Sequence, residues 1–561
     1  MPSRVVDHLV RAVAATGVRH IFGVDGANIE DLYDAIFDST DGVEGVIAKH
    51  EFSAATMADG YARSTGGLGV VAATSGGGAM NLVAGLAESY ASRVPVLALV
   101  GQSPTGLDGR GAFQDSSGKA GTIDAARLFE TISRYCARVE DPDRLPEILH
   151  EAITAALQGG PAVLLLPKDI QQATIEYTPP RAPQRIGAHD DEGYARVRDA
   201  LIAAKRTGKV VLIAGDQIAR DDARSEFAAL AATLDATVGV APDAKDTYDN
   251  RGPGFRGVAG SMGHPDLTAA IRSAELCLLV GTPLPVTSRA GLDGPLADCR
   301  VASTGAVTPY LPAIHAESTD LARTLTDLTA DLTAEFSART EIADPTTEPL
   351  TALEVPRAHG PGLRYREVVE TIDAALPDGT DVFADAGNTG AAVVHHLRVP
   401  RGGRFVVALG MGGMGYAFGA GIGSAFARHR HGDGIRRTVV IAGDGSFYMH
   451  GMEVHTAVEY DLPITFVVFN NNAHAMCVTR EQIYYRNRYS FNRFRDTSIG
   501  EGIAAMFPSM PAHAVRRPEE LAGALDRCFT ASGPSFLSID CDPDEIPPFV
   551  PFLSETPRRI P

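Results

Sequence analysis

The chain has 561 residues, 45% of them hydrophobic, and this length predicts two to four domains with sizeable cores. Its formal net charge is −19 with scattered lysines and arginines, which argues against nucleic acid or an anionic membrane surface as a partner. The six cysteines form no CxxC pair, so we expect neither structural zinc nor disulfides, and a reducing cytoplasm fits best. We also expect no signal peptide and no membrane span, because no apolar run is long enough.

Strand-like apolar runs alternate with Ala-rich helical runs from the start of the chain. The first series contains VEGVIAKH, GVVAATSGG, VPVLALVGQ and AVLLLPKD. Short apolar runs that alternate with amphipathic helices are typical of a parallel sheet covered by helices. This series predicts an N-terminal α/β domain over residues 1–175.

Two further series of the same kind follow. A middle domain over residues 190–337 is predicted from GKVVLIAGD, ATVGVAP and AELCLLVGT. Residues 338–362 gather Pro, Thr and charges, which predicts a linker. A third domain over residues 363–545, with a tail over residues 546–561, is predicted from DVFADAG, RFVVALG, RRTVVIAGDG, ITFVVFNN and PSFLSID. The fold class is therefore α/β, with three consecutive doubly wound parallel-sheet domains.

One stretch of the third domain, GDGSFYMHGMEVHTAVEYDLPITFVVFNNN, places polar residues after two successive strands, with a helix expected over residues 446–460. Asp444 and Asn471 should then meet at one sheet edge, where ligands of open α/β sheets bind. Mg²⁺ prefers carboxylate, amide and carbonyl oxygens, and Gly443 and Gly445 let backbone N–H groups approach a diphosphate. On spacing alone, a plain turn followed by strand-capping asparagines stays an alternative.

This stretch resembles the cofactor motif of thiamine diphosphate (ThDP) enzymes, and other segments extend the resemblance. AKHEFSAATMADGYAR resembles the family's segment with the activating glutamate, TSGGGAMNLVAGLAES its glycine loop, and GRGAFQD a substrate-side loop of acetohydroxyacid (acetolactate) synthases. ALGMGGMGYAFGAGIG resembles the family's loop before the GDG strand, and EYDLPITFVVFNN is similar to the corresponding sequence of the synthases. The likeness covers most of the first and third domains, which would be the pyrimidine-binding and diphosphate-binding domains, and is weaker in the middle.

The resemblance assigns roles to three residues around the cofactor's rings. It makes Glu51 the carboxylate that acts on N1′ of the aminopyrimidine, although a glutamate that stabilises a helix N-terminus is the commoner use of this position. Met414 would hold the two rings in a bent arrangement, or it is ordinary core filling. The carbonyl of Gly412 would accept the 4′-amino hydrogen.

The resemblance also implies a metal site and an assembly. Mg²⁺ would be held by Asp444, Asn471 and the backbone oxygen of Ala473. The other cofactor contacts that it implies are Gly26, Asn388, Gly443, Gly445, Ser446 and Met476. Because the family's glutamate and metal ligands face each other across subunits, we expect a homodimer or homotetramer with active sites at the interfaces.

The cofactor implies a reaction on a 2-oxo acid, in which carbon dioxide leaves and an enamine remains. Decarboxylases of the family protonate it with two adjacent histidines, whereas the loop here reads Phe113-Gln114, as in the synthases. This choice favours carboligation to a second carbonyl, with Gln114 holding an oxygen of the adduct or acceptor. A loop glutamine that bonds to backbone is the alternative.

Departures from the synthases concern the substrate and the flavin. The chain has no Trp, and Arg480 lies where synthases carry the Trp of the acceptor pocket. A guanidinium there suits an anionic acceptor, unless Arg480 is a plain surface residue. In the middle domain Pro283 replaces the family's substrate arginine, which puts bound FAD and the usual pyruvate acceptor in doubt.

Three other positions differ without an evident purpose. Asp25 and Asn28 add polar groups near the cofactor cleft, and their role does not follow from the sequence. Cys477 lies where decarboxylases have a catalytic glutamate, and small packing explains it better than a nucleophile does.

Three hypotheses for the function follow. The first is a ThDP- and Mg²⁺-dependent carboligase of the acetolactate synthase type, which takes small 2-oxo acids and has an anionic or non-standard acceptor. The second is a 2-oxo acid decarboxylase that releases an aldehyde. The third is a relative that binds the cofactor without turnover, against which the presence of Glu51, Asp444 and Asn471 argues.

Overall fold

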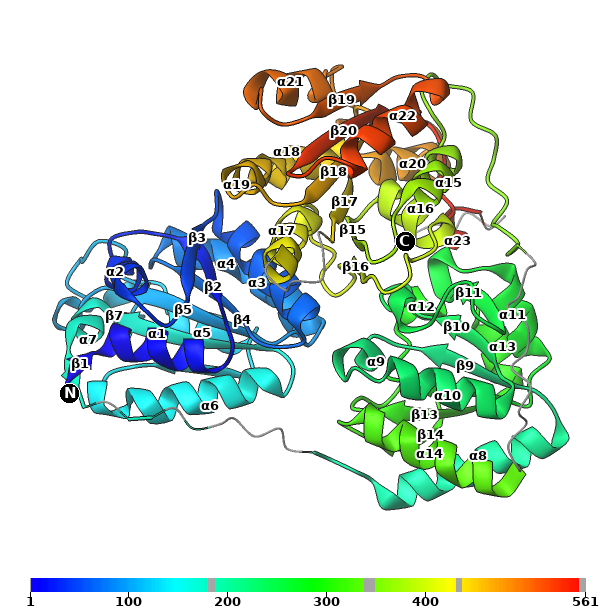
Figure 1. The fold of residues 1–561 in the computed structure, drawn as a ribbon, viewed down its shortest axis with the longest axis horizontal. Helices are drawn as coiled ribbons and strands as arrows, with labels where there is room; N and C mark the ends of the chain where they lie inside the picture. Colours follow the sequence, from blue (N-terminus) through cyan, green and yellow to red (C-terminus); the bar gives the residue numbers. More distant parts are fainter. Residues whose placement is uncertain are drawn as a thin grey trace.

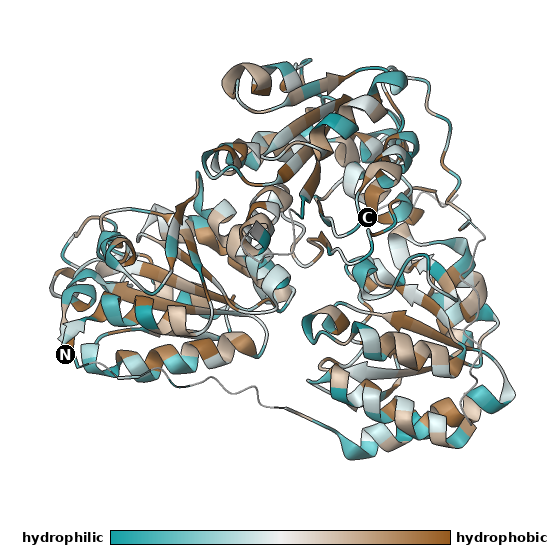
Figure 2. Ribbon diagram, viewed as in Figure 1, coloured by the Kyte–Doolittle hydropathy of each residue, from teal (hydrophilic) through white to brown (hydrophobic). Residues whose placement is uncertain are grey.

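The computed structural model describes residues 2–176, 178, 179, 181, 187–336, 349–429 and 436–553 (Figure 1). It contains three six-stranded sheets in which every pair of neighbouring strands is parallel. Helices cover the sheets, and apolar residues line the strands and the helix faces turned toward them (Figure 2). The predicted fold class is confirmed.

The first sheet has the strand order β3-β2-β4-β5-β7-β6, and a short antiparallel pair, β1-β8, lies apart from it. Its β5 is buried along its whole length, as expected for a strand between two helix layers. The strands are β1 Ser3–Arg4, β2 His20–Val24, β3 Glu44–Ile47, β4 Gly69–Ala73, β5 Val96–Gln102, β6 Tyr135–Arg138, β7 Pro161–Pro167 and β8 Thr174–Ile175. The helices are α1 Val5–Ala15, α2 Glu30–Asp38, α3 Glu51–Thr65, α4 Gly77–Ala91, α5 Ala125–Glu130, α6 Leu145–Leu157 and α7 Lys168–Gln172.

The middle sheet has the order β11-β10-β9-β12-β13-β14, so the direction of winding reverses between β9 and β12. Its strands are β9 Val210–Ala214, β10 Thr237–Val240, β11 Phe255–Val258, β12 Leu276–Val280, β13 Arg300–Gly305 and β14 Ile314–Glu317. Its helices are α8 Asp191–Thr207, α9 Gln217–Arg220, α10 Arg224–Leu234, α11 Pro265–Arg272, α12 Val286–Arg289, α13 Asp293–Asp298 and α14 Leu321–Phe336.

The third sheet has the order β16-β15-β17-β18-β20-β19. Its strands are β15 Asp381–Ala384, β16 Phe405–Val407, β17 Thr438–Gly443, β18 Ile464–Asn470, β19 Ala512–Val515 and β20 Ser535–Asp540. Its helices are α15 Tyr365–Ala375, α16 Asn388–His396, α17 Tyr416–His429, α18 Asp444–His450, α19 Val454–Glu459, α20 Ala475–Tyr484, α21 Ile499–Met506, α22 Pro518–Phe529 and α23 Val550–Leu553.

The prediction of one continuous helix over residues 446–460 is wrong, because the structure has two helices there. Helix α18 already begins at Asp444, and a 3-10 turn, Gly451–Glu453, separates it from α19. A Cβ at Gly451 would lie 2.2 Å from the ring of Phe447, so a larger residue at the break would force this ring to move.

The three sheets fall within the three predicted domain ranges, but the exact limits stay predictions. Of the predicted linker, residues 338–348 lie outside the described residues, and the described remainder contains no helix or strand. The predicted tail includes α23, and its residues 554–561 lie outside the described part. All six cysteines are free thiols, as expected. Within the described part of the chain, every helix is too short or too polar to cross a membrane.

The first and third domains pack against each other through α3 and α17 (Figure 1). A Cβ at Gly60 would lie 1.9 Å from the carbonyl oxygen of Ala420, and one at Gly423 would lie 1.9 Å from that of Met57. Because glycine has no side chain, the two backbones approach each other closely. These helices carry the segments that the sequence associates with the cofactor.

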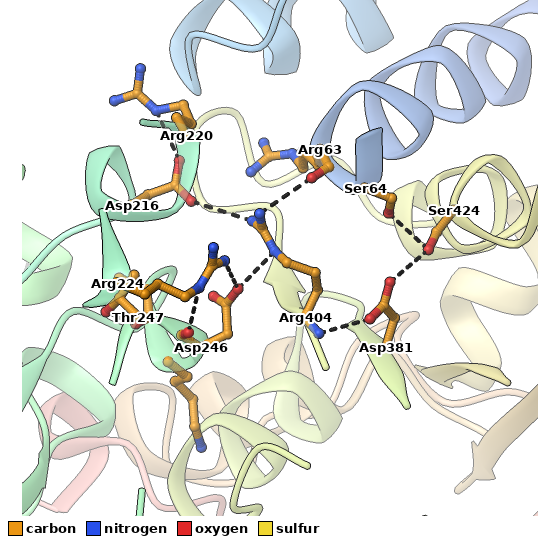
Figure 3. Close-up of polar contacts among 12 residues, drawn as sticks. Arg63, Ser64, Asp216, Arg220, Arg224, Asp246, Thr247, Asp381, Arg404 and Ser424 are labelled. Carbon is orange, nitrogen blue, oxygen red and sulfur yellow. Dashed lines mark hydrogen bonds and ion pairs between the residues drawn. The ribbon is translucent and has the colours of Figure 1, made fainter. Parts of the chain in front are cut away.

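A second junction joins all three domains at Arg404 (Figure 3). Its guanidinium donates to the carbonyl oxygen of Arg63 in the first domain at 3.2 Å and forms an ion pair with Asp246 of the middle domain at 2.7 Å. Its backbone N–H donates to Asp381 of the third domain at 2.8 Å. Asp246 is fully buried and also pairs with Arg224, at 2.6 Å. Arg404 therefore connects the three domains, and its partner carboxylate on Asp246 is buried.

Removal of this junction should destabilise the chain. We expect Arg404→Ala to lower the free energy of unfolding by about 2 kcal/mol in urea denaturation, because Asp246 loses one of its two cationic partners. The matched control is Arg516→Ala, whose ion pair with Glu501 is exposed and should be worth less than about 1 kcal/mol. Equal losses in both variants would contradict the role given to Arg404.

Candidate active site

Three neighbouring strands of the third sheet end in polar residues at the same edge. Asp385, Asp444 and Asn471 follow β15, β17 and β18, and the register places Gly443 opposite Phe469. The N–H of Ala473 donates to the Asp444 carboxylate at 3.2 Å, so the loop after β18 folds onto the start of α18. The juxtaposition expected from the strand pattern is thus present in the structure.

Asp444 is a buried carboxylate without a cationic partner among the described residues. Burial raises its pKa to about 7, although N–H groups of Gly445 and Ala473 donate to it and act in the opposite direction. A bound cation would favour the ionised form of such a group. The electrostatics of Asp444 therefore suit a metal ligand.

Two neighbouring amides have unpaired oxygens. Asn471 donates through its Nδ2 to the hydroxyl of Tyr365 at 3.0 Å, while its buried Oδ1 has no hydrogen-bond partner. Asn388 donates to Thr479 at 3.1 Å, and its buried Oδ1 is likewise unpaired. Buried acceptors are rarely left unpaired, so these oxygens fit a site that binds a ligand.

The chemistry of this donor set fits a hard divalent cation with a diphosphate. Asp444 offers a carboxylate oxygen, Asn471 an amide oxygen, and Ala473 lies beside them. In the described part of the chain no three His, Cys, Asp or Glu side chains form a metal cluster, so a metal here would need amide, carbonyl or diphosphate oxygens as well. The sequence could not indicate Tyr365, which fixes the orientation of Asn471 from the distant helix α15.

Gly445 is required by the packing of two side chains against the GDG turn. A Cβ at this position would lie 2.6 Å from Nδ1 of His474 and 3.3 Å from the terminal methyl carbon of Met414. Met414 therefore lies next to the predicted diphosphate site. Gly412 precedes it with φ +65°, a left-handed conformation that favours glycine.

Asp385 organises the surrounding loops and was missed by the sequence analysis. Its carboxylate accepts hydrogen bonds from Ser446 Oγ at 2.7 Å and from the N–H groups of Gly415 and Ala417 at 3.0 and 2.9 Å. Burial raises its pKa. Its place after the buried strand DVFA was the available signal, since it matches the position of Asp444 after β17.

Glu51 opens α3, as the sequence predicts, and its carboxylate is held within its own domain. Asn81 on α4 donates to Glu51 Oε2 at 2.9 Å, and Oε1 lies 3.0 Å from the position of a Cβ at Gly78. The turn around it touches the third domain, because Phe52 stacks on His450 with ring centroids 4.3 Å apart. The segment that contains Glu51 and the domain that contains the predicted metal site therefore contact each other within one chain. An active site between subunits stays a prediction.

The substrate-side loop meets the glycine loop through side chains. Gln114, with φ +59°, accepts through its Oε1 from the hydroxyls of Thr74 and Ser75, each at 3.4 Å. Asn28 donates to Ser75 at 2.7 Å, which gives this residue a structural role that the sequence did not reveal. A Cβ at Gly26 would lie 2.8 Å from Thr74, so the backbone must approach closely here. Gln114 thus contacts hydroxyl side chains of the glycine loop, and its role toward a substrate stays a prediction.

Other predicted residues lie at the periphery of this arrangement. Phe113 is 74% exposed, and Asp25 accepts a hydrogen bond from the next N–H. Met476 and Cys477 lie half-buried in the first turn of α20, and Arg480 is exposed one turn later. The one side-chain contact of Arg480 in the described structure is with the sulfur of Cys477, at 3.9 Å. Its guanidinium is therefore open to solvent.

The side chain of Gln217 lies at the crevice where the winding of the middle domain reverses. Between β9 and β12 the buried side chain of Gln217 donates to the carbonyl oxygen of Ser318 and to Asp221, both at 3.0 Å, and accepts from Ala306 N–H at 2.8 Å. A dinucleotide in this strand order would place its phosphates in that crevice. A cavity of about 520 Å³ adjoins Gln217 and is lined partly by Pro283.

Family models for each part of this architecture match the chain. The N-terminal TPP binding domain of thiamine pyrophosphate enzymes matches residues 3–120, their central domain residues 195–301, and their C-terminal TPP binding domain residues 385–539. Together these matches cover more than half of the chain. The protein belongs to the thiamine pyrophosphate enzymes.

Similar proteins within this family carry out different reactions. A probable acetolactate synthase large subunit from Methanocaldococcus jannaschii is 28% identical, with 97% of this chain and 93% of the relative covered. A sulfoacetaldehyde acetyltransferase from Alcaligenes xylosoxydans xylosoxydans is 27% identical over 89% of this chain and 86% of its own length. The crystal structure of benzoylformate decarboxylase from Polynucleobacter necessarius shares the fold, with a TM-score of 0.82, 19% identity, and coverage of 97% and 99%.

Proposed function

We propose that the protein uses ThDP and Mg²⁺ to decarboxylate a small 2-oxo acid and to join the remaining fragment to a second carbonyl compound. The observation that carries the proposal is the unpaired amide oxygen of Asn471 beside the buried carboxylate of Asp444. This pair would hold the metal and, through it, the diphosphate. Gly443, Gly445 and Ser446 bring backbone and hydroxyl groups to the same place.

Bound ThDP would supply the nucleophilic carbon and the electron sink that decarboxylation needs. Glu51 would share a proton with N1′ of the aminopyrimidine, and Asn81 holds the Glu51 carboxylate in one orientation. Met414 packs against Gly445 and would support the bent arrangement of the two rings. The carbonyl of Gly412 and the side chain of Met476 complete the proposed contacts.

Carboligation is favoured by the environment of Gln114. Its amide oxygen is occupied by two hydroxyls, so its NH₂ group is the part left to donate to an oxygen of the substrate. The adjacent Phe113 adds an exposed apolar surface. Neither residue can protonate a carbanion, which is what simple decarboxylation would require here.

An anionic acceptor is supported by Arg480. Its guanidinium is exposed and has no carboxylate partner in the described structure. The similar acetyltransferase is named for sulfoacetaldehyde, an aldehyde that bears a sulfonate. A planar guanidinium can bind a sulfonate, carboxylate or phosphate through two hydrogen bonds.

The remaining parts of the proposal concern assembly and flavin. We propose a homodimer or homotetramer in the cytoplasm, with active sites at subunit interfaces. We leave FAD out of the proposal, because the segment that the family uses for FAD and substrate reads VGTPLPVTSR here, with Pro283 in place of the arginine. The domain limits at residues 175, 190, 337, 363 and 545 are part of the same proposal.

Product identification tests the reaction. Purified protein with ThDP, Mg²⁺ and a panel of 2-oxo acids, including dicarboxylates, should release carbon dioxide and form a carbon–carbon ligation product detectable by mass spectrometry. Glu51→Gln should bind ThDP but turn over at least about 100-fold more slowly, because the proton partner of N1′ is lost. Aldehyde as the only product would establish the decarboxylase instead, and cofactor binding without turnover would establish the non-catalytic relative.

The role of Arg480 has its own test. Arg480→Ala should raise KM for anionic acceptors by about tenfold and leave KM for neutral acceptors within about twofold, because one charge-assisted contact is lost. The matched control is Arg486→Ala, two residues beyond the end of α20. Equal changes for charged and neutral acceptors would contradict the assignment.

A further inference from the structure

A buried glutamate of the first domain holds the loop that precedes Met414. Glu88, on α4, is 2% exposed and reaches across to residues 410–412 of the third domain. Its Oε1 accepts from Gly410 N–H at 3.1 Å, and its Oε2 accepts from the N–H groups of Met411 and Gly412 at 2.6 and 3.2 Å. Three successive backbone donors therefore converge on one carboxylate.

The Glu88 carboxylate also receives a hydrogen bond from its own domain. Ser92, one turn further along α4, donates its hydroxyl to Glu88 Oε1 at 2.8 Å. A Cβ at Gly410 would lie 2.8 Å from the same oxygen and 2.7 Å from Ala91, so only glycine allows the loop to come this close. The hydrogen bond from Ser92 to Glu88 and the glycine at position 410 therefore both favour this contact.

The loop that Glu88 holds is the one that the cofactor proposal depends on. Gly412 would offer its carbonyl to the aminopyrimidine, and Met414 packs against Gly445 of the diphosphate turn. Asp385 binds the N–H of Gly415 at the far end of the same loop. Residues 410–415 are therefore held at one end by the first domain and at the other by the third.

The geometry requires two acceptor oxygens at this position, which a carboxylate provides and a carboxamide does not. Four donors point at the two oxygens of Glu88. A glutamine would keep one acceptor oxygen and direct its NH₂ group at N–H groups, which leaves buried donors without partners. Charge-assisted bonds to backbone N–H groups are also stronger than neutral ones.

We propose that Glu88 is a positioning residue for cofactor binding, which presets residues 410–412 before ThDP arrives. The inference rests on the proposed cofactor site and deepens it. Helix α4 then serves both halves of the site, because Asn81 near its start orients Glu51 and Glu88 near its end orients the loop before Met414. Through Glu88, the packing of the first domain against the third fixes the conformation of residues 410–412.

Hydrogen exchange on cofactor-free protein tests the proposal without turnover. In the wild type, the amides of Met411 and Gly412 should exchange at least about tenfold more slowly than those of exposed loops, and Glu88→Gln should remove this protection. Titration with ThDP and Mg²⁺ should show affinity at least about tenfold weaker for Glu88→Gln, with Glu88→Asp in between. Glu147→Gln, at an exposed ion pair on α6, is the matched control and should match the wild type in both measurements.

The outcomes separate this inference from the proposed function. Fast exchange of these amides in the wild type overturns it, even if Glu88→Gln does not fold. So does a folded Glu88→Gln protein that keeps both protection and affinity, as a purely space-filling role would predict. If wild-type protein protects the loop but does not bind ThDP, the proposed function fails while the loop contact stands.

Discussion

The adjacency of β17 and β18 is the constraint on which the candidate site depends. Because the two strands run parallel and in register, Asp444 and Asn471 leave the sheet side by side, and the following loop returns to place Ala473 on the Asp444 carboxylate. A buried carboxylate with a raised pKa next to an unpaired amide oxygen is unfavourable without a cation. The same sheet edge would thus offer oxygen ligands to the metal and the diphosphate of the proposed site.

Buried carboxylates connect the two cofactor-binding domains in both directions. Glu88 of the first domain receives N–H groups from the loop before Met414. Glu453 of the third domain receives the N–H of Lys49, two residues before Glu51, and burial raises the Glu453 pKa to about 7. Each domain thus helps to fix a segment of the other that belongs to the proposed cofactor site, in addition to the close crossing of α3 and α17.

Much of this architecture follows from the sequence because the relevant signals are local. Buried strands, the Gly-Asp-Gly turn and the asparagines after β18 predicted the three sheets and the meeting of Asp444 with Asn471. Tyr365 and Glu88 were not found, because their function lies in contacts with residues far along the chain, which periodicity does not encode. Asp385 had a local signal, its position directly after the buried strand β15. The break of the expected helix at Gly451 also had a local signal, because glycine is unfavourable inside a helix. Substrate choice is harder still to predict, because the residues proposed for it, Phe113 in a loop and Arg480 on α20, are exposed and have few contacts that constrain them.

The central claim is that Asp444 and Asn471 form a magnesium clamp for the diphosphate of ThDP. Its most direct test is calorimetric titration of cofactor-free protein with ThDP, with and without Mg²⁺, for the wild type and Asn471→Leu. The account predicts that Mg²⁺ strengthens ThDP binding to the wild type at least about tenfold and has little effect on the variant. Binding of ThDP that is independent of Mg²⁺ in the wild type, or an equal effect of Mg²⁺ on both proteins, would contradict it.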